Sequence, residues 1–123
     1  MRKALLALSV IALAAPGAAR DRNVLPTATP AGKPQSCIPL RSIRQSHVRG
    51  DYVIDFEMTG GKVYRNTLPN SCPRLGFEEA FGYKTSISQL CSVDIITVLD
   101  RGSPGIPGPS CGLGKFQPVT LAE

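Results

Sequence analysis

The sequence predicts an all-β protein, a small antiparallel barrel or sandwich that is stapled by disulfides and preceded by a signal peptide and a proline-rich linker. Three observations lead to this prediction. Apolar and polar residues alternate with a period of two from residue 51 onward, as in a strand with one buried face. The 123 residues include 12 Gly and 11 Pro, which interrupt helices and favour turns between short strands. Four cysteines in so short a chain indicate two disulfides that stabilise a small core.

Residues 1–19 have the organisation of a signal peptide. Two basic residues follow the initial Met, and the apolar run 4–15 is shorter than the roughly 20 residues of a transmembrane helix. The small residues Gly17 and Ala19 occupy the −3 and −1 positions of a signal-peptidase cleavage site. We therefore expect cleavage after Ala19 and a mature protein that is periplasmic or secreted, without a stable membrane anchor.

The next segment, residues 20–35, is predicted to be a flexible linker, because three prolines lie among small and polar residues. The folded domain is then expected over residues 36–121, with 122–123 as a tail. The whole chain has a formal charge of +5, but this domain holds 9 basic and 7 acidic side chains, a net charge of +2. So small an excess gives no reason to expect a nucleic-acid partner.

All four cysteines, Cys37, Cys72, Cys91 and Cys111, follow the signal segment. They are 35, 19 and 20 residues apart in turn, so no closely spaced pair suggests a zinc site, and the chain has a single His. We therefore predict two structural disulfides, no metal and no cofactor. Three pairings are possible. We favour the nested one, Cys72–Cys91 inside Cys37–Cys111, because its outer bond would tie the two ends of the domain together.

The clearest strand begins at residue 51, and its alternate side chains are predicted to face the core and the solvent. The core-facing set is Tyr52, Ile54, Phe56 and Met58, and the solvent-facing set is Asp51, Val53, Asp55 and Glu57.

A hairpin joins this strand to a return strand over residues 62–68. We predict a three-residue loop, Thr59–Gly61, with Gly61 in the left-handed conformation of a β-bulge. This loop sets Phe56 opposite Tyr64, whereas a two-residue loop would set an aromatic side chain opposite an arginine. The same register pairs Asp55 with Arg65 and Tyr52 with Leu68.

The other elements follow from shorter patterns. Residues 94–99 form a nearly continuous apolar and β-branched run, which predicts a central strand covered on both faces. Further strands are predicted over 38–48, with an interruption near Pro39, over 81–85 and over 115–121, together with a helical turn at 88–91 and a loop at 102–109.

With these residues in place, the sequence resembles a family of small exported proteobacterial proteins that is classed as a domain of unknown function. The shared pattern includes Cys37-Ile38-x-Leu40-Arg41, Ile54-x-Phe56-x-Met58, Gly60-Gly61-Lys62-Val63-Tyr64-Arg65-Asn66-x-Leu68-Pro69, Cys72-Pro73-x-Leu75, Leu90-Cys91 and Cys111-Gly112-Leu113-Gly114. The resemblance covers nearly the whole predicted domain. It implies an exported, disulfide-linked β domain, and it carries over no catalytic residue.

The single histidine, His47, could act as a general base, but the sequence places no orienting partner near it. It is followed by the tripeptide Arg49-Gly50-Asp51, which spells an adhesion motif and also suits a turn between strands. We expect a turn here, with the imidazole in solvent.

A carboxylate site is conceivable from Asp55 and Glu57, which share one side of a strand, together with the distant Asp94. A solvated polar face of the strand accounts for Asp55 and Glu57 as well as a carboxylate site does. Glu78 and Glu79 are expected in a solvated loop. A base-stacking platform would need exposed aromatic rings. The hairpin register places Tyr52, Phe56 and Tyr64 in the core instead.

The function expected from the sequence is that of a non-catalytic exported domain that binds an envelope component or another exported protein, with no catalytic residue assigned. The alternative is a small periplasmic hydrolase that uses carboxylates from Asp55, Glu57 or Asp94.

Overall fold

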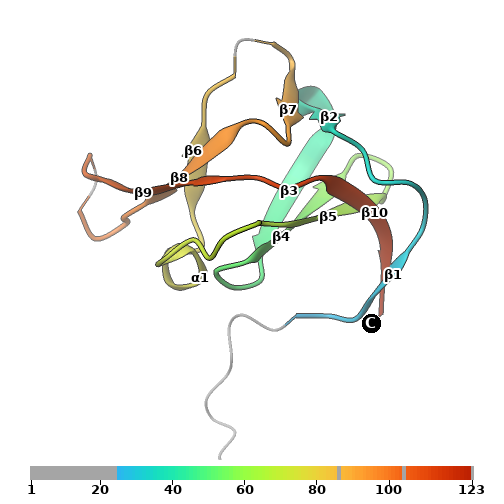
Figure 1. Ribbon diagram of the computed structural model, residues 1–123, viewed down its shortest axis with the longest axis horizontal. Coiled ribbons are helices and arrows are strands. Elements are labelled where there is room, and N and C mark those ends of the chain that lie inside the picture. The colour runs from blue at the N-terminus through green and yellow to red at the C-terminus, as the bar shows by residue number, and fades with distance from the viewer. Residues whose placement is uncertain (1–24, 86, 104, 123) are drawn as a thin grey trace, which may run out of the picture.

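The computed structural model describes residues 25–85, 87–103 and 105–122, in which short antiparallel strands form three sheets (Figure 1). The largest sheet has the order β1-β10-β5-β4-β3 and comprises β1 (Ala28–Pro30), β3 (Ile43–Val48), β4 (Val53–Met58), β5 (Val63–Thr67) and β10 (Phe116–Leu121). A three-stranded sheet comprises β6 (Phe81–Tyr83), β8 (Ile95–Leu99) and β9 (Pro107–Gly112), with β8 in the middle. A two-stranded sheet pairs β2 (Cys37–Pro39) with β7 (Gln89–Cys91), and the helical elements are η1 (Leu40–Ser42) and α1 (Leu75–Glu78).

The predicted all-β class with antiparallel pairing is confirmed, and the strands do not close into a barrel. The predicted signal peptide lies outside the described residues. No helix among the residues described is long and apolar enough to cross a membrane.

One core joins the three sheets. The Phe56 ring of β4 packs edge-on against Phe116 of β10, with centroids 5.6 Å apart, and against Phe81 of β6, with centroids 6.2 Å apart. Ile38 and Leu90, a cross-strand pair of the two-stranded sheet, are fully buried in the same cluster. These large apolar side chains supply the main favourable free energy of folding in so small a domain.

The hairpin has the predicted register. Phe56 lies opposite Tyr64, and the Met58 N–H donates to the Lys62 carbonyl, which leaves the three-residue loop 59–61 between them. Gly61 has a φ of 95°, as predicted, and Gly60 also has a positive φ of 96°. Both values lie in a region that side chains with a Cβ rarely adopt, which explains the paired glycines.

The predicted faces of the hairpin hold for Ile54, Phe56 and Met58, which are buried, but not for two other residues. Tyr52 is exposed, because it precedes the start of β4 and lies outside the packed part of the sheet. Asp55 is fully buried rather than solvated. The side chains of Arg49 and Arg65 contact its carboxylate, an arrangement that strand periodicity alone does not reveal.

The amino-terminal segment differs from the flexible linker predicted over residues 20–35. In its described part, β1 pairs with β10, and the Ala31 N–H donates to the Pro118 carbonyl at 2.8 Å. Gln35 then forms a bridge with Phe116. The proline-rich composition is compatible with this edge strand, because an edge strand needs few backbone donors.

The strand β8 is central in its sheet, as predicted, but it is covered on one face only. Ile96 and Val98 are buried, whereas Ile95 and Leu99 on the opposite face are exposed. Two local predictions are also wrong. Residues 89–91 form β7 instead of a helical turn, because they pair with β2, and β9 begins inside the predicted loop at Pro107.

The two predicted disulfides are present, but their pairing is not the nested one. Cys37 is bonded to Cys91, and Cys72 to Cys111. The first bond follows from the β2–β7 register, which sets Cys37 directly opposite Cys91. The ends of the domain are joined by the β1–β10 pairing instead, so no terminal disulfide is needed. Two disulfides indicate an oxidising environment outside the cytoplasm.

A clasp between Asn66 and Gly114 fixes the approach to β10. The buried Asn66 side-chain amide donates to the Gly114 carbonyl and accepts from the Gly114 N–H, both at 2.8 Å. A Cβ at position 114 would lie 2.3 Å from the Thr67 carbonyl oxygen, so only glycine fits here.

Candidate functional site

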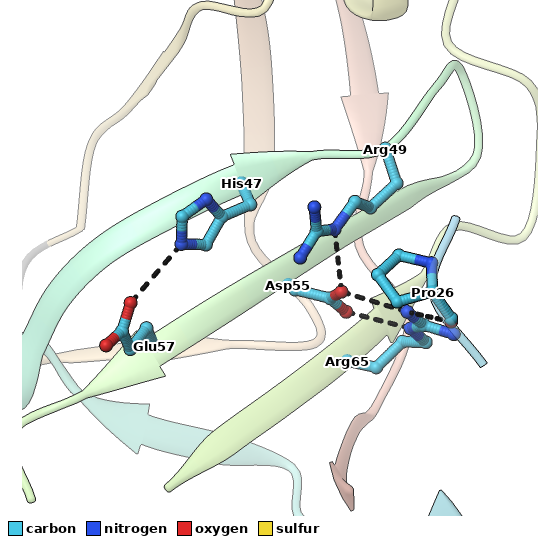
Figure 2. A network of polar contacts seen from close by, with 6 residues as sticks. All are labelled: Pro26, His47, Arg49, Asp55, Glu57 and Arg65. Carbon is cyan, nitrogen blue, oxygen red and sulfur yellow. Dashed lines mark hydrogen bonds and ion pairs between the residues drawn. The ribbon is translucent and has the colours of Figure 1, made fainter. Parts of the chain in front are cut away.

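The most concentrated group of charged side chains lies on the outer face of the five-stranded sheet and is centred on Asp55 (Figure 2). Arg65 donates from Nε to Asp55 Oδ1 at 2.8 Å and from Nη2 to Asp55 Oδ2 at 2.9 Å. Arg49 donates from Nε to the same Oδ2 at 2.9 Å, and Arg65 Nη2 also donates to the Pro26 carbonyl at 3.0 Å. The amino-terminal segment is thereby attached to this group.

Strand register brings these residues together. Asp55 on β4 lies opposite Arg65 on β5 and opposite His47 on β3, so their side chains share one face. Arg49 directly follows β3 and contacts the Asp55 carboxylate from the β3 side of β4, opposite Arg65. The predicted Asp55–Arg65 pair is therefore confirmed, whereas its predicted exposure to solvent is wrong.

A second, more exposed part of the group surrounds Glu57. Its carboxylate lies 3.3 Å from His47 Nε2 and 3.5 Å from Arg44 Nη1. His47 thus has a polar partner that was not evident from the sequence, because the two residues are ten positions apart and meet only through the β3–β4 pairing.

The chemistry of the Asp55 carboxylate is that of a structural anchor. It has no solvent-accessible surface, and each of its oxygens accepts charge-assisted hydrogen bonds from guanidinium groups. A general base or a nucleophile needs access to a substrate, which this carboxylate lacks. Its role is to hold three segments of chain together: β4, β5 and the end of β3.

The third predicted carboxylate, Asp94, belongs to a different part of the molecule. It lies in the turn before β8, where its Oδ2 accepts from the Cys91 N–H at 2.7 Å. The structure therefore brings Asp55 and Glu57 to one face, whereas Asp94 lies in the turn between β7 and β8.

Glu78 is a further carboxylate whose predicted solvated position is wrong. It is buried at the end of α1, where it pairs with Arg74 and accepts from the Arg101 N–H at 3.1 Å. It thus connects α1 to the segment that follows β8. Sequence alone could not reveal this, because Arg101 is 23 residues away.

The Arg49-Gly50-Asp51 tripeptide forms a turn, as expected. Arg49 is held by Asp55, and the Asp51 Oδ1 accepts from the Gly76 N–H at 2.7 Å. Both charged side chains thus make internal contacts, in contrast to an adhesion loop, which would present them to a receptor.

The second candidate site is an apolar surface on the outer side of the three-stranded sheet, which we call the β8 face. It consists of Val93, Ile95, Leu99 and Ile106, of which Val93 is 84% and Ile95 53% exposed. This surface contains two adjoining hollows, and both are lined in part by Leu99 and Pro107. This surface was not predicted, because the continuous apolar run of β8 indicated a strand buried on both faces.

The rim of the β8 face is charged at both ends. Lys84 and Asp94 line one hollow, and Asp100 and Arg101 line the other. Among the residues that line the hollows, two basic side chains are thus matched by two acidic ones. An apolar centre with a balanced polar rim is the usual composition of a protein–protein interface.

Phe56 and the three tyrosines do not share one exposed face. Phe56 is buried on β4 and Tyr64 is half-buried on β5, whereas the exposed Tyr52 lies just before β4 and the exposed Tyr83 lies on β6. Among residues 25–85, 87–103 and 105–122, no three His, Cys, Asp or Glu side chains form a group that could hold a metal ion.

Comparison with protein-family models, with curated proteins and with solved structures gives no match to this chain.

Proposed function

We propose that this chain is an exported, non-catalytic domain that binds another exported protein or a protein of the cell envelope through the β8 face. The observation that carries the proposal is the exposed apolar centre of that face, Val93, Ile95, Leu99 and Ile106. Contiguous exposed apolar surface is costly in water and commonly marks a site of association.

The alternative of a carboxylate hydrolase receives no comparable support. Of its three candidate residues, Asp55 is enclosed by two arginines, and Asp94 caps a turn. Glu57 is partly exposed, but its carboxylate is paired with His47 and Arg44. A binding role needs none of these groups to be reactive.

A protein partner suits the β8 face better than an anionic membrane surface does. Binding to an anionic bilayer requires an excess of cations around the apolar residues. Here Asp94 and Asp100 offset Lys84 and Arg101. Export as such is proposed from the amino-terminal sequence, and the two disulfides support it.

The proposal can be tested by site-specific photo-crosslinking in the cells that produce the protein. A photoreactive amino acid at position 95 is expected to give one discrete adduct with another protein. The same amino acid at the exposed Thr120 of β10, on a different sheet, serves as the control. Equal adducts from both positions, or none from position 95, would contradict the proposal.

A further inference from the structure

We propose that the outer edge of β3 accepts an extended, acidic segment of a partner protein as an additional strand. This edge belongs to the five-stranded sheet, so the inference does not depend on the β8 face. It is based on the direction of the backbone groups of β3, on the exposure of its residues and on the charge beside it.

The strand β3 is the end member of its sheet and is paired on one side only, with β4. The Arg49 N–H donates to the Val53 carbonyl at 2.8 Å. Because hydrogen-bonded pairs alternate in an antiparallel ladder, His47 and Gln45 also direct their backbone groups toward β4. The N–H and C=O groups of Ser46 and Val48 therefore point outward, where a new strand could bond to them.

The other sheet edges in the described part of the chain are less suited to such pairing. The edge strands β1, β2, β6 and β7 each have three residues, and β1 includes Pro30. The edge strand β9 has six residues but contains Pro107 and Pro109, which lack an N–H. In contrast, β3 has six residues and no proline.

Exposure of the β3 side chains shows that the edge is open. Ser46 lies opposite Phe56 and therefore on the core side of the sheet, yet it is exposed. Val48, also on that side, is partly buried and packs against the core. The register irregularity between Ile43 and Gln45 disturbs only the start of the strand, so residues 45–48 remain regular.

Charge beside the edge selects the kind of partner. Residues 40–50 contain three arginines and one histidine but no acidic residue. On the outer face, Arg44, Arg49 and Arg65 face two carboxylates, Asp55 and Glu57, which leaves one positive charge in excess even with a neutral histidine. Arg44, with a 61% exposed side chain, is the most accessible of these cations.

An acidic strand complements this charge, and a second copy of the same edge does not. Antiparallel pairing of two β3 strands would place arginine and histidine side chains near one another, which destabilises a sheet. A complementary segment would instead carry acidic side chains beside Gln45, His47 and Arg49. Its alternate side chains, beside Ser46 and Val48, would be small or apolar.

The test uses the full, oxidised chain with a ¹⁵N label and an eight-residue blocked peptide of alternating Glu and Val. We expect the peptide to shift the amide resonances of β3 and to slow hydrogen exchange at Ser46 and Val48. A Lys-Val peptide of the same length should bind at least tenfold more weakly. Equal binding of both peptides, or shifts confined to Ile95 and Leu99 of the β8 face, would overturn the inference and leave the proposed function untouched.

Two pairs of variants separate backbone pairing from charge. Ser46→Pro removes an outward N–H without removing a β3–β4 hydrogen bond and should weaken peptide binding at least tenfold, whereas Ser46→Ala retains the N–H and should bind normally. Arg44→Glu should weaken binding several-fold, and Arg101→Glu in the turn after β8 should not. Arg44→Glu remains informative if the proline variant fails to fold. Unchanged binding by Arg44→Glu and by a folded Ser46→Pro protein would refute strand addition, as would self-association of the chain through β3.

Discussion

Replacement of Asp55 by Asn tests whether the charged group of the outer sheet face is structural. The carboxylate accepts three hydrogen bonds, two from Arg65 and one from Arg49. Hydrogen bonds to charged groups contribute about 1.5–3 kcal/mol each, and separation of a buried ion pair costs about 3–5 kcal/mol. Asn retains one acceptor oxygen, and the side chains of Arg49 and Arg65 are 21% and 14% exposed, so water can partly replace the lost contacts. We therefore expect a loss of about 3 kcal/mol in the free energy of unfolding, by the same principles.

The measurement is equilibrium unfolding of the oxidised protein in urea, monitored by circular dichroism. With a slope of about 2 kcal/mol per molar urea, this loss lowers the midpoint by about 1.5 M. Glu57→Gln is the matched control, because its two ionic contacts are longer and more exposed, and it should cost less than about 1 kcal/mol. An Asp55→Asn protein as stable as the parent would refute the structural assignment. A more stable one would indicate a carboxylate maintained for function at the expense of stability.

Four further predictions concern the core, the disulfides and the β8 face. Gly114→Ala should destabilise the domain by about 2–4 kcal/mol in the same urea assay, because its Cβ would clash with the Thr67 carbonyl and break the Asn66 clasp; an unchanged midpoint would contradict this account. Peptide mapping without reduction should yield Cys37–Cys91 and Cys72–Cys111 peptides, and recovery of a Cys72–Cys91 peptide would disprove the crossed pairing. Replacement of both Cys72 and Cys111 by Ala should lower the free energy of unfolding by about 4 kcal/mol, as loop-closure entropy predicts for a 39-residue separation, and a loss below about 1 kcal/mol would argue against that mechanism. Leu99→Asp should change the free energy of unfolding by less than about 1 kcal/mol, since Leu99 is exposed, and a larger loss would mean that the β8 face is part of the core.

Local patterns were sufficient to predict the hairpin. The glycine pair and the alternation of residues 52–58 define the loop length, and loop length then determines every pair along β4 and β5. The same local information predicted the final strand, residues 115–121, and the interruption near Pro39. These features depend on residues that are close in sequence, and local sequence patterns are therefore sufficient to predict them.

Features that depend on distant segments were not predicted. Asp55 is contacted by Arg49 from beyond β3 and by Arg65, which also bonds to the Pro26 carbonyl, and Glu78 is contacted by the segment after β8. The disulfide pairing depends on which strand lies beside β2, which cysteine spacing does not encode. The exposure of one face of β8 was not predicted for the same reason. A continuous apolar run has the same sequence pattern whether its second face is covered by this chain or by a partner protein.

The proposed function is tested most directly by combining the crosslinker at position 95 with Leu99→Asp. Both residues lie on the β8 face, and the substitution adds a charge to its apolar centre at a side chain that is 44% exposed. If the face binds a protein partner, the adduct obtained from position 95 should fall at least tenfold while the level of folded protein stays constant. An adduct of undiminished yield from the Leu99→Asp protein would contradict binding through the β8 face.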